Sequence, residues 1–429
     1  MMQRFDPDPC IKCNICVTAC PVAAVTDLFA GPKYAGPQSE RFRGGEQPVP
    51  DLSVDYCSGC RACNLACPSG GNIAEMNARA RYEMVQAGKI PWRLRLRNNL
   101  IARTELLGAL AQPIAALSNA LLSNPFMRRI IEITLGIAAK AYFPPFTRQR
   151  FSKWWRKSHP PLSSSGTKPV RQVAFFHGCA TEFYEPRVGQ AAVYVLEALG
   201  FEVLVPPQNC CGLPLLSNGE FDAARKLHEN NVNSLVEYAR QGIPIVGTST
   251  SCTLTIKEEA PDLLEMHDPD TSLVARMTYD INEFLLTLPE FADLPFGPLP
   301  VTLPYHQPCQ YKAHHLGSPA VEVLAHIPEL EIIESTATCC GIAGTYGYKA
   351  EKYEIAQAIG EPLFEFVKSV DAPVSVCDSE TCRWQITNGT GLPGVHPIEL
   401  IAASLGWKAE STVPIFEMSP RAEAEQPPA

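Results

Sequence analysis

Two cysteine ladders of identical spacing near the N-terminus constrain this chain more than any other feature. The first comprises Cys10, Cys13, Cys16 and Cys20, and the second comprises Cys57, Cys60, Cys63 and Cys67. Each ends in a proline, Pro21 or Pro68. The two-residue spacers let a tight turn aim consecutive sulfurs at one inorganic core. The proline ends the local helix and removes a backbone donor that would need a partner.

The complete run, C-x-x-C-x-x-C-x-x-x-C-P, is typical of bacterial ferredoxins with two [4Fe–4S] clusters. In that arrangement three thiolates hold one cube, and the fourth crosses to the other cube. The sequence therefore predicts a first cluster held by Cys10, Cys13, Cys16 and Cys67, and a second held by Cys57, Cys60, Cys63 and Cys20. A structural zinc site is the alternative, because four thiolates also suit a tetrahedral ion. Zinc motifs normally pair two C-x-x-C units, which makes the ladders a poorer match.

Composition indicates a chain of two or three domains with reduced thiols. The 429 residues are 46% hydrophobic, which is enough to form the hydrophobic cores of two or three domains. The 17 cysteines are too sparse for a small secreted disulfide scaffold. The first residues lead into Cys10 without the apolar stretch of a signal peptide. We therefore expect a cytoplasmic location.

Composition, together with the residues that break helices and strands, predicts six segments along the chain. We expect a mainly helical ferredoxin-type domain over 1–90, a basic and partly amphipathic helical segment over 91–157, a linker over 158–169, a first cysteine-rich repeat over 170–300, a second over 301–411, and a disordered tail over 412–429. The region from Lys89 to Lys157 carries thirteen Lys and Arg against two acids, although the whole chain has a net charge of −9. This asymmetry favours an anionic surface as a partner of the basic segment.

The two cysteine-rich segments form a duplication. Cys179 recurs as Cys309, the pair Cys210-Cys211 recurs as Cys339-Cys340, and Cys252 recurs as Cys382. A near-constant offset of about 130 residues at every one of these positions is the mark of an internal repeat.

Alternating strand and helix patterns place these cysteines at one edge of a sheet. Predicted strands lie at 173–176, 201–205 and 243–246 in the first repeat, and at 301–305, 330–333 and 374–376 in the second; predicted helices lie at 187–199 and 220–240. Such alternation predicts a parallel α/β sheet, in which ligands gather at the carboxyl ends of the strands. The repeated cysteines therefore predict one or two further redox centres. Buried cysteines acting as small hydrophobes, a redox dithiol and zinc are the alternatives.

A family resemblance follows from these residues. The chain resembles the paired cysteine-rich domains of heterodisulfide reductases and glycolate oxidase iron–sulfur subunits, and within that group it most resembles the iron–sulfur subunit family of anaerobic glycerol-3-phosphate dehydrogenases. The similarity lies in Cys10-Ile11-Lys12-Cys13, Gly31-Pro32-Lys33, Ala35-Gly36-Pro37, 174–179 (AFFHGC), 339–347 (CCGIAGTYG) and 382–386 (CRWQI).

The resemblance implies an electron-transfer subunit rather than a substrate-oxidising one. It implies that electrons pass from a flavoprotein dehydrogenase subunit to the membrane quinone pool, at the cytoplasmic side of the inner membrane. Two functional alternatives stay open. The donor could be a glycolate or lactate dehydrogenase, or the cysteine-rich repeats could themselves catalyse disulfide reduction as in heterodisulfide reductases. A zinc-stabilised assembly subunit is a third, non-redox alternative.

The chain departs from the fuller family pattern in both repeats. Ser249 and Ser379 stand where the closing C-x-x-C would have its first cysteine, and Cys377 lies two residues before Ser379. Each repeat still offers four sulfurs: Cys179, Cys210, Cys211 and Cys252 in the first, and Cys309, Cys339, Cys340 and Cys382 in the second. Cys377 is either a substitute ligand or, as we favour, the end of a buried strand.

Other motifs are uninformative or absent. No G-x-G-x-x-G follows a strand in a βαβ unit, and no phosphate-binding P-loop sequence occurs, so the substrate-oxidising flavin is expected on a partner. His177 and His306 precede repeat cysteines, and His314-His315 follows Cys309. Each could tune a cluster or serve a quinone proton, but satisfying backbone groups is the simpler interpretation.

Residues 106–127 contain no charge, which raises the question of a membrane span. Seven polar or helix-breaking residues interrupt this stretch, and they favour an interfacial helix pair broken near Pro113 and Pro125. Trp154 and Trp155 lie among basic residues, as in segments that bind the headgroup layer. The sequence predicts peripheral membrane attachment, with a solvated face or a docking surface for an acidic subunit as the alternative. Nucleic-acid binding is not expected, because the chain is acidic and lacks a recognisable binding fold.

Overall fold

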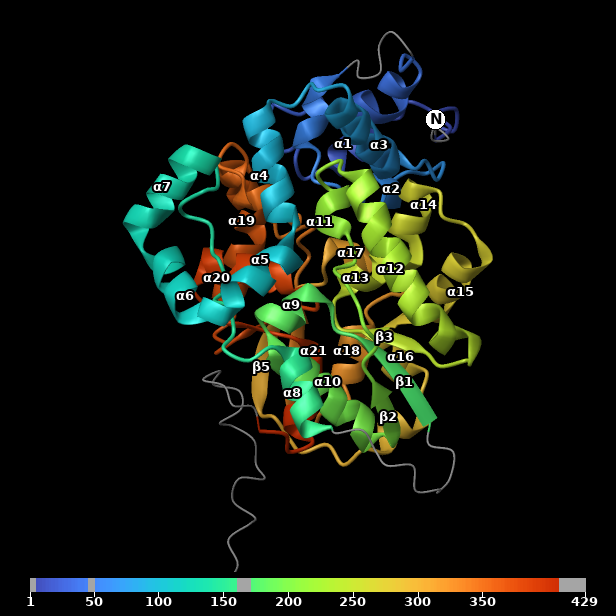
Figure 1. Cartoon of the computed structure of the whole chain (residues 1–429), viewed down its shortest axis with the longest axis vertical. Helices are drawn as coiled ribbons and strands as arrows, with labels where there is room; N and C mark the ends of the chain where they lie inside the picture. Colours follow the sequence, from blue (N-terminus) through green and yellow to red (C-terminus); the bar gives the residue numbers. More distant parts are fainter. Residues whose placement is uncertain (1–4, 45–50, 160–170, 409–429) are drawn as a thin grey trace, which may run out of the picture.

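The computed structural model describes residues 5–44, 51–159 and 171–408 (Figure 1). The predicted linker from residue 160 and the predicted tail lie outside the described residues. Two four-stranded sheets, parallel throughout, form the C-terminal half. Their strands are β1 (Arg171–Phe176), β2 (Phe201–Leu204), β3 (Ile245–Gly247), β4 (Thr278–Asp280), β5 (Val301–Tyr305), β6 (Leu330–Glu334), β7 (Ser375–Val376) and β8 (Gly394–Val395).

The two sheets have the same topology. Their strand orders are β2-β1-β3-β4 and β6-β5-β7-β8, so each repeat places its first strand second from one edge. The central strand β1 is apolar on both faces, and Val173, Ala174, Phe175 and Phe176 are all buried, as expected of a parallel sheet covered by helices. The predicted fold class and the six predicted strands are confirmed. The short strands β4 and β8 were not predicted.

Helices cover both sheets and join the repeats. Those of the first repeat are α9 (Gly178–Phe183), α10 (Pro186–Ala198), α11 (Leu213–Leu216), α12 (Phe221–Arg240), α13 (Thr250–Leu254), η4 (Thr255–Glu259), α14 (Ala260–Leu264), α15 (Pro269–Met277), α16 (Ile281–Leu286) and η5 (Pro289–Asp293). Those of the second are α17 (Cys309–Ala313), α18 (Pro319–Leu324), η6 (Tyr346–Tyr348), α19 (Tyr353–Ser369), α20 (Glu380–Thr390) and α21 (Pro397–Ser404). Helix α10 packs against α21, and α16 packs against α18, so the repeats share one apolar core.

The N-terminal region is mainly helical, as predicted, and lies at the top of Figure 1 above the repeats. Its elements are α1 (Ile15–Thr18), η1 (Tyr34–Gln38), η2 (Leu52–Tyr56), α2 (Ala62–Leu65) and α3 (Ile73–Gln86). Helix α3 contacts η1, η2, α2 and α14, so it joins the N-terminal region to the first repeat. Arg81 strengthens this junction, because its guanidinium donates to the Ser217 carbonyl at 2.8 Å and also bonds the backbone around Val54.

The basic segment forms a series of short helices; all but the last lie in the left half of Figure 1, and the last lies near the lower centre. They are α4 (Trp92–Ala102), α5 (Thr104–Ala111), η3 (Gln112–Ile114), α6 (Ala115–Ser123), α7 (Pro125–Leu135) and α8 (Phe151–Ser158). The predicted breaks are confirmed. The 3₁₀ turn η3 contains Pro113, and Asn124 caps α7 by accepting the N–H of Phe126 at 2.9 Å. Trp154 and Trp155 are half-buried and pack on the shared apolar core. This packing leaves both tryptophans partly exposed, and their predicted contact with a membrane stays a prediction.

Candidate metal centres

Four cysteines of the ladders line a cavity at the outer end of the N-terminal region. They are Cys10, Cys13 and Cys16 from the first ladder and Cys67 from the second. Lys12 and Asn14 have left-handed backbones, with φ of 61° and 71°, and the chain then enters α1. These reversals fold the ladder around the cavity, so that three sulfurs from one short segment face one space.

The second ladder repeats this geometry. Cys57, Cys60 and Cys63 line another cavity together with Cys20 of the first ladder. Gly59 and Arg61 have φ of 69° and 61°, at the same ladder positions as Lys12 and Asn14, and α2 follows as α1 does. The structure thus brings together the same two groups of four that the sequence predicted. Among the described residues, no three His, Cys, Asp or Glu side chains converge closely enough to hold a single ion; these groups line volumes instead.

The surroundings of the sulfurs suit thiolates that carry a metal cluster. Gly71 and Ala23 donate backbone N–H groups to the sulfurs of Cys67 and Cys20, at 3.3 and 3.4 Å. Burial raises the pKa of Cys20 to about 11, so this thiol needs a bound cation to become a thiolate at neutral pH. Although burial opposes the change, hydrogen bonds from Ser69 and Gly71 lower the pKa of the outer Cys67.

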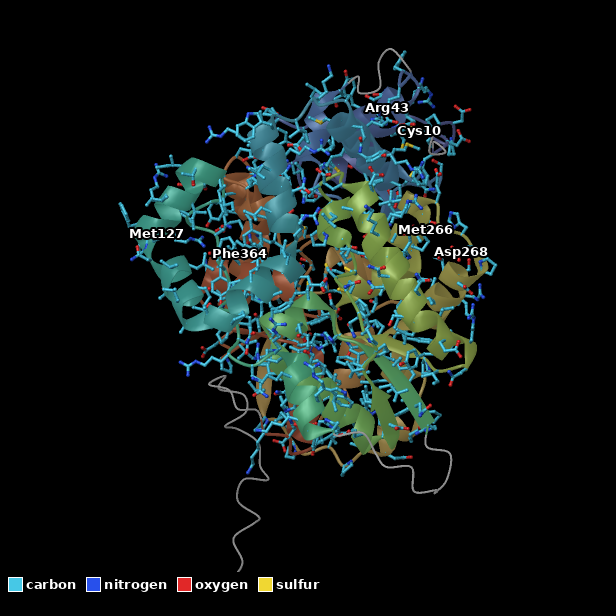
Figure 2. All side chains as sticks on the ribbon, viewed as in Figure 1. Cys10, Arg43, Met127, Met266, Asp268 and Phe364 are labelled. Carbon is cyan, nitrogen blue, oxygen red and sulfur yellow. The ribbon has the colours of Figure 1, made fainter. Side chains whose placement is uncertain are left out.

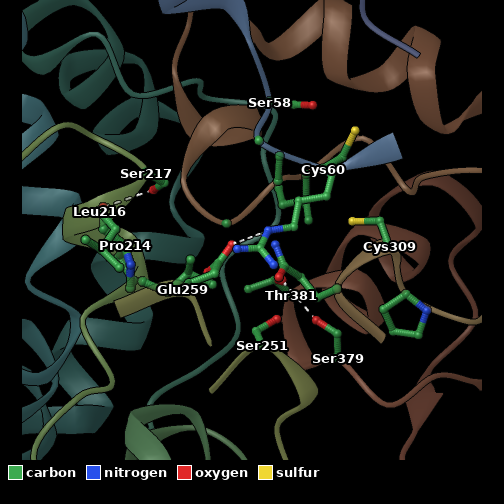
Figure 3. A pocket seen from close by; sticks show the side chains of 18 of the residues that line it. Ser58, Cys60, Pro214, Leu216, Ser217, Ser251, Glu259, Cys309, Ser379 and Thr381 are labelled. Carbon is green, nitrogen blue, oxygen red and sulfur yellow. Dashed lines mark hydrogen bonds and ion pairs between the residues drawn. The ribbon is translucent and has the colours of Figure 1, made fainter. Parts of the chain in front are cut away.

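The repeats bring all eight of their predicted cysteines to one inner cavity of about 120 Å³. Figure 3 shows part of its lining, with Cys309 labelled. They are Cys179, Cys210, Cys211, Cys252, Cys309, Cys339, Cys340 and Cys382. The sulfurs of Cys179 and Cys210 are 3.8 Å apart, and those of Cys340 and Cys382 are 3.0 Å apart. The cysteines follow β1, β2 and β3 in one repeat and β5, β6 and β7 in the other, so the carboxyl ends of both sheets meet at this cavity.

The glycine after each vicinal cysteine pair is required by geometry. Gly212 and Gly341 have φ of 94° and 89°. A Cβ at Gly341 would lie 1.9 Å from the carbonyl oxygen of Ala356, so only glycine fits there. The N–H of Gly341 donates to the sulfur of Cys339 at 3.3 Å. The turn therefore aims both sulfurs and a backbone donor toward the same space.

Cys60 connects the two kinds of site. It lines the cavity of the second ladder and also the inner cavity, where it lies in one apolar cluster with Cys309 and Cys339. Figure 3 shows Cys60 beside Cys309. The second ladder therefore meets the second repeat directly. Because Cys16, Cys63 and Cys67 lie together in a further apolar cluster, the cysteine groups form a continuous series.

Comparison with known proteins agrees with this arrangement. Residues 7–71 match the family model of the 4Fe-4S dicluster domain, and residues 173–257 and 303–387 each match that of the cysteine-rich domain. In Escherichia coli (strain K12), the anaerobic glycerol-3-phosphate dehydrogenase subunit designated C is 37% identical over 92% of this chain and 98% of its own length. The chain belongs to the family of this glycerol-3-phosphate dehydrogenase subunit. It is an iron–sulfur protein with a [4Fe–4S] dicluster domain and two cysteine-rich domains.

More distant relatives of this dehydrogenase subunit family member match nearly the whole chain. The probable glycolate oxidase iron-sulfur subunit of Bacillus subtilis (strain 168) is 24% identical over 93% of this chain and 94% of its own length. In Methanosarcina barkeri, the dihydromethanophenazine:CoB–CoM heterodisulfide reductase subunit designated D is 23% identical over 94% of this chain and 95% of its own length.

The departures of this family member from the fuller cysteine pattern have structural explanations. Ser249 accepts the N–H of Cys252 and so caps α13, while Ser379 lines the inner cavity and lies 3.3 Å from the Thr381 hydroxyl. Cys377 follows β7, is fully buried, and packs with Cys340 and Cys382 in an apolar cluster, but unlike those two it does not line the inner cavity. Its position agrees with the end of a buried strand.

Two functional contacts were not predicted from the sequence. The Thr104 hydroxyl lies 3.2 Å from the Cys179 sulfur, and the Glu105 carboxylate accepts the N–H of Cys210 at 2.9 Å. The first turn of α5 therefore touches the sulfurs of the first repeat. No local motif marks these residues, because the contact depends on how a distant helix packs.

A buried ion-pair network was also not predicted from the sequence. Arg61, next to Cys60, lies 3.2 Å from Glu75 of α3 and 3.2 Å from Glu259 of η4. All three side chains are nearly inaccessible. Burial raises the pKa of Glu259, although the Arg61 guanidinium acts against this change. Arg61 thus ties the dicluster domain to the first repeat beside the inner cavity.

The histidines have separate environments. His306 is buried, and neither ring nitrogen has a hydrogen-bond partner among the described residues. His314 bridges the repeats, because its Nε2 lies 3.3 Å from both the Thr253 hydroxyl and the Thr250 carbonyl oxygen. His177 has Nδ1 2.9 Å from the Gly178 carbonyl oxygen and lines a separate cavity near the surface. His315 has a left-handed backbone, with φ of 57°.

Proposed function

We propose that this chain carries electrons from a flavoprotein subunit that oxidises glycerol 3-phosphate to a quinone in the membrane. The observation that supports this most strongly is the series of four cysteine groups, from Cys13 at the surface to Cys179 beneath α5. Each cluster would take four thiolates. Cys10, Cys13, Cys16 and Cys67 hold the first, and Cys57, Cys60, Cys63 and Cys20 hold the second. The repeats contribute Cys179, Cys210, Cys211 and Cys252, and Cys309, Cys339, Cys340 and Cys382, to further centres.

Electrons enter at the first cluster in this proposal. Cys13 is exposed, and the neighbouring Ile11 and Ile15 have 66% and 45% of their surface accessible. Exposed apolar side chains around a redox centre suit the docking of a dehydrogenase subunit. Cys10 lies at the upper right of the molecule, far from Met127 of α7 at its left edge (Figure 2). Entry and exit of electrons are therefore assigned to different sides of the protein.

Electrons then pass inward through the second cluster. Cys60 lies beside Cys309 and Cys339, so the second cluster adjoins the second repeat before the first. The inner cavity joins the two repeats. At the first turn of α5, Thr104 lies beside the sulfur of Cys179 and Glu105 accepts the backbone N–H of Cys210, so we assign the first repeat as the last centre of the series.

The outer side of α5, η3, α6 and α7 is the proposed membrane surface. We call it the α5–α7 apolar face; it consists of Leu106, Leu110, Ile114, Leu117, Leu121, Phe126, Ile130 and Ile133, which are 38–73% exposed. Their spacing follows the helical period on each side of the Pro125 break. An exposed apolar face of this size, close to exposed Arg103 and Arg129, is typical of helices that lie in a membrane interface.

We infer that these helices lie on the bilayer rather than across it. By length and composition, Thr104–Ser123 could span a membrane, and 11% of its most apolar part is buried in the protein. Its polar residues, however, are held by the protein. The Asn119 side chain exchanges hydrogen bonds of 2.9 and 2.8 Å with the backbone of Phe146, and Gln112 bonds the Arg148 carbonyl. A crossing helix would lose these contacts and the Thr104–Cys179 contact. We therefore propose peripheral attachment, at the cytoplasmic side of the inner membrane.

Reconstitution tests the proposed function. The chain, purified without oxygen, would be combined with its flavoprotein partner and with quinone-containing vesicles. We expect glycerol 3-phosphate to reduce the iron–sulfur signals and then the quinone, and the flavoprotein alone to reduce a soluble dye but not the quinone. Quinone reduction at the same rate without this chain would contradict the proposal. An iron content of about eight atoms per chain would mean that only the ladders hold clusters. A higher iron content would mean that the repeats hold further clusters.

A second donor is supported by the similarity to the glycolate oxidase subunit over nearly the whole chain. In that case the same series of centres would accept electrons from a glycolate or lactate dehydrogenase. Supplying each candidate flavoprotein with its own substrate distinguishes the donors, because only a docking partner would reduce the first cluster.

A further inference from the structure

A second, larger cavity opens beside the sulfurs of the first repeat. Its volume is about 450 Å³, within the range of small-molecule sites. It lies between α5, α8, α9 and the segment that leads from β2 to Cys210. We call it the outer cavity. The exposed Arg156 forms part of its lining, so the cavity reaches the protein surface.

The outer and inner cavities share a wall. Cys179 and Cys210 line both, which makes them the partition between the buried cysteine groups and the surface. A centre held by these two sulfurs would be in contact with any molecule in the outer cavity. None of the other repeat cysteines lines the outer cavity.

The walls of the outer cavity suit a flat, uncharged ring with carbonyl oxygens. Trp155 and Phe183 supply aromatic surface. The guanidinium of Arg150 lies over the Phe183 ring, 5.2 Å from its centroid. Its Nε donates a hydrogen bond to the Gln112 side chain, and its Nη2 donates to the Ala109 carbonyl oxygen. Its Nη1 has no hydrogen-bond partner among the described residues. The exposed guanidinium of Arg156 lies on the same lining. These guanidinium groups can donate to carbonyl oxygens.

The charge of the outer cavity's walls and its closeness to the α5–α7 apolar face also favour a flat, uncharged ring. Two cations, Arg150 and Arg156, face two carboxylates, Glu105 and Glu182, so the walls carry no excess charge that would select an anion. Helix α5 places Ala109 on the outer cavity and its neighbour Leu110, 66% exposed, on the α5–α7 apolar face. A lipid-soluble molecule held at that face would therefore need to pass only one helix to reach Cys179.

We propose that the outer cavity is the binding site of the quinone headgroup. This assignment rests on the proposed function. Two electrons reach the quinone one at a time from the centre at Cys179 and Cys210, and two protons come from water at the open side of the cavity. Both carbonyl oxygens become hydroxyls, and a quinol leaves. Glu182 already accepts two hydrogen bonds from Ser152, at 2.9 and 2.7 Å, so it serves as a fixed wall.

Photolabelling with a short-chain azido-naphthoquinone tests the assignment on the holoprotein without turnover. We expect label in peptides from α5, α8 or α9, and at least a tenfold loss of labelling in Ala109→Phe, whose ring would occupy the outer cavity. Ala116→Phe, at an exposed position on α6 outside the cavity lining, is the matched control and should label normally. Arg156→Gln removes a surface donor without filling the cavity and should weaken labelling severalfold.

The results of these experiments distinguish a failure of the proposed quinone site from a failure of the proposed function. Ala109→Phe should keep its iron content and EPR signals, and glycerol 3-phosphate should still reduce its iron–sulfur signals through the flavoprotein, while quinone reduction falls at least tenfold. Label outside the outer cavity, with quinone reduction unchanged in Ala109→Phe and Arg156→Gln, would overturn this site and leave the proposed function standing. Absence of both quinone labelling and quinone reduction in the unaltered complex would overturn both.

Discussion

The hydroxyl of Thr104 lies 3.2 Å from the sulfur of Cys179 and joins the apolar helix α5 to the cysteines of the first repeat. The next residue, Glu105, accepts the N–H of Cys210 at 2.9 Å. The same helix that exposes Leu106 and Leu110 is therefore anchored at its first turn to the cysteines of the first repeat. In the proposed function, membrane attachment and electron exit therefore share this one helix.

Thr104→Val should lower the reduction potential of the centre held by the first repeat. A hydrogen bond to a cluster sulfur stabilises the more negative, reduced state. Losing about 1 kcal/mol of such stabilisation corresponds to a shift on the order of 40 mV for one electron. EPR during a reductive titration measures the shift. Thr104→Ser retains the hydroxyl and should titrate like the unaltered protein, whereas equal potentials for all three would show that the contact has no electrostatic effect.

The crossed ligand assignment predicts which cluster each ladder cysteine serves. Cys20→Ala should remove the second cluster and preserve the first, because Cys20 lines the cavity of Cys57, Cys60 and Cys63. Cys67→Ala should do the reverse. Iron analysis and EPR of the remaining signal distinguish the two. If Cys20→Ala instead removed the cluster of its own ladder, the fourth thiolates would not cross.

Much of this organisation could be predicted from local patterns. The ladder spacing predicts the two cysteine groups because a tight turn and a proline act within a few residues. The repeat offset likewise predicts two matching sheets. The contacts that join the domains could not be predicted in this way. Arg61 lies within a ladder, but its partner Glu259 belongs to a different domain far along the chain, and nothing in the local sequence of either residue indicates the pair. The packing of Trp154 and Trp155 could not be predicted in this way either, because it depends on a core that is built from distant parts of the chain.

If the α5–α7 apolar face binds the membrane, acidic substitutions on it should weaken that binding. Leu117→Glu combined with Ile133→Glu should reduce binding to vesicles by at least about a hundredfold, because each buried aliphatic side chain contributes about 1.5–3 kcal/mol. Sedimentation with vesicles rich in anionic lipid measures this. Leu286→Glu alters an equally apolar but remote side chain that is 39% exposed, and it should bind normally. Unchanged binding of the double variant would exclude this face as the attachment surface.

Arg61→Met should destabilise the junction between the dicluster domain and the first repeat. Removing the guanidinium leaves Glu75 and Glu259 buried without their cation, which costs about 3–5 kcal/mol in comparable buried pairs. Anaerobic chemical unfolding, with iron content as a check on cluster retention, measures the loss. Arg240→Met breaks an exposed pair with Asp270, 52% and 47% accessible, and should cost less than about 1 kcal/mol. Similar effects of both variants would contradict a special role for the Arg61 network.

His314 predicts a pH dependence of the interface between the repeats. Burial, reinforced by the nearby Lys257, lowers the pKa of His314 from 6.5 to about 4. Its Nε2 donates to the Thr250 carbonyl oxygen, and its buried Nδ1 has no partner among the described residues, so the charged form has nowhere to place a second proton. The folded state therefore keeps the ring neutral while the unfolded chain takes up a proton below about pH 6.5. The stabilising contribution is complete above that pH and is lost as the pH falls toward 4, by at most about 3 kcal/mol.

The difference between the unaltered protein and His314→Gln isolates this contribution. Loss of clusters in acid affects both proteins alike, and so does titration of the other buried histidines, which are His177, His228, His306 and His396. Anaerobic unfolding at about pH 7.5, 6 and 5 should show the free energy of unfolding falling more steeply for the unaltered protein than for His314→Gln. The variant lacks the group that takes up a proton only after unfolding, so its curve should be flatter across this range. Parallel curves would mean that His314 is protonated as readily in the folded protein as in the unfolded chain, and the interface between the repeats would then have to be open to water at that position.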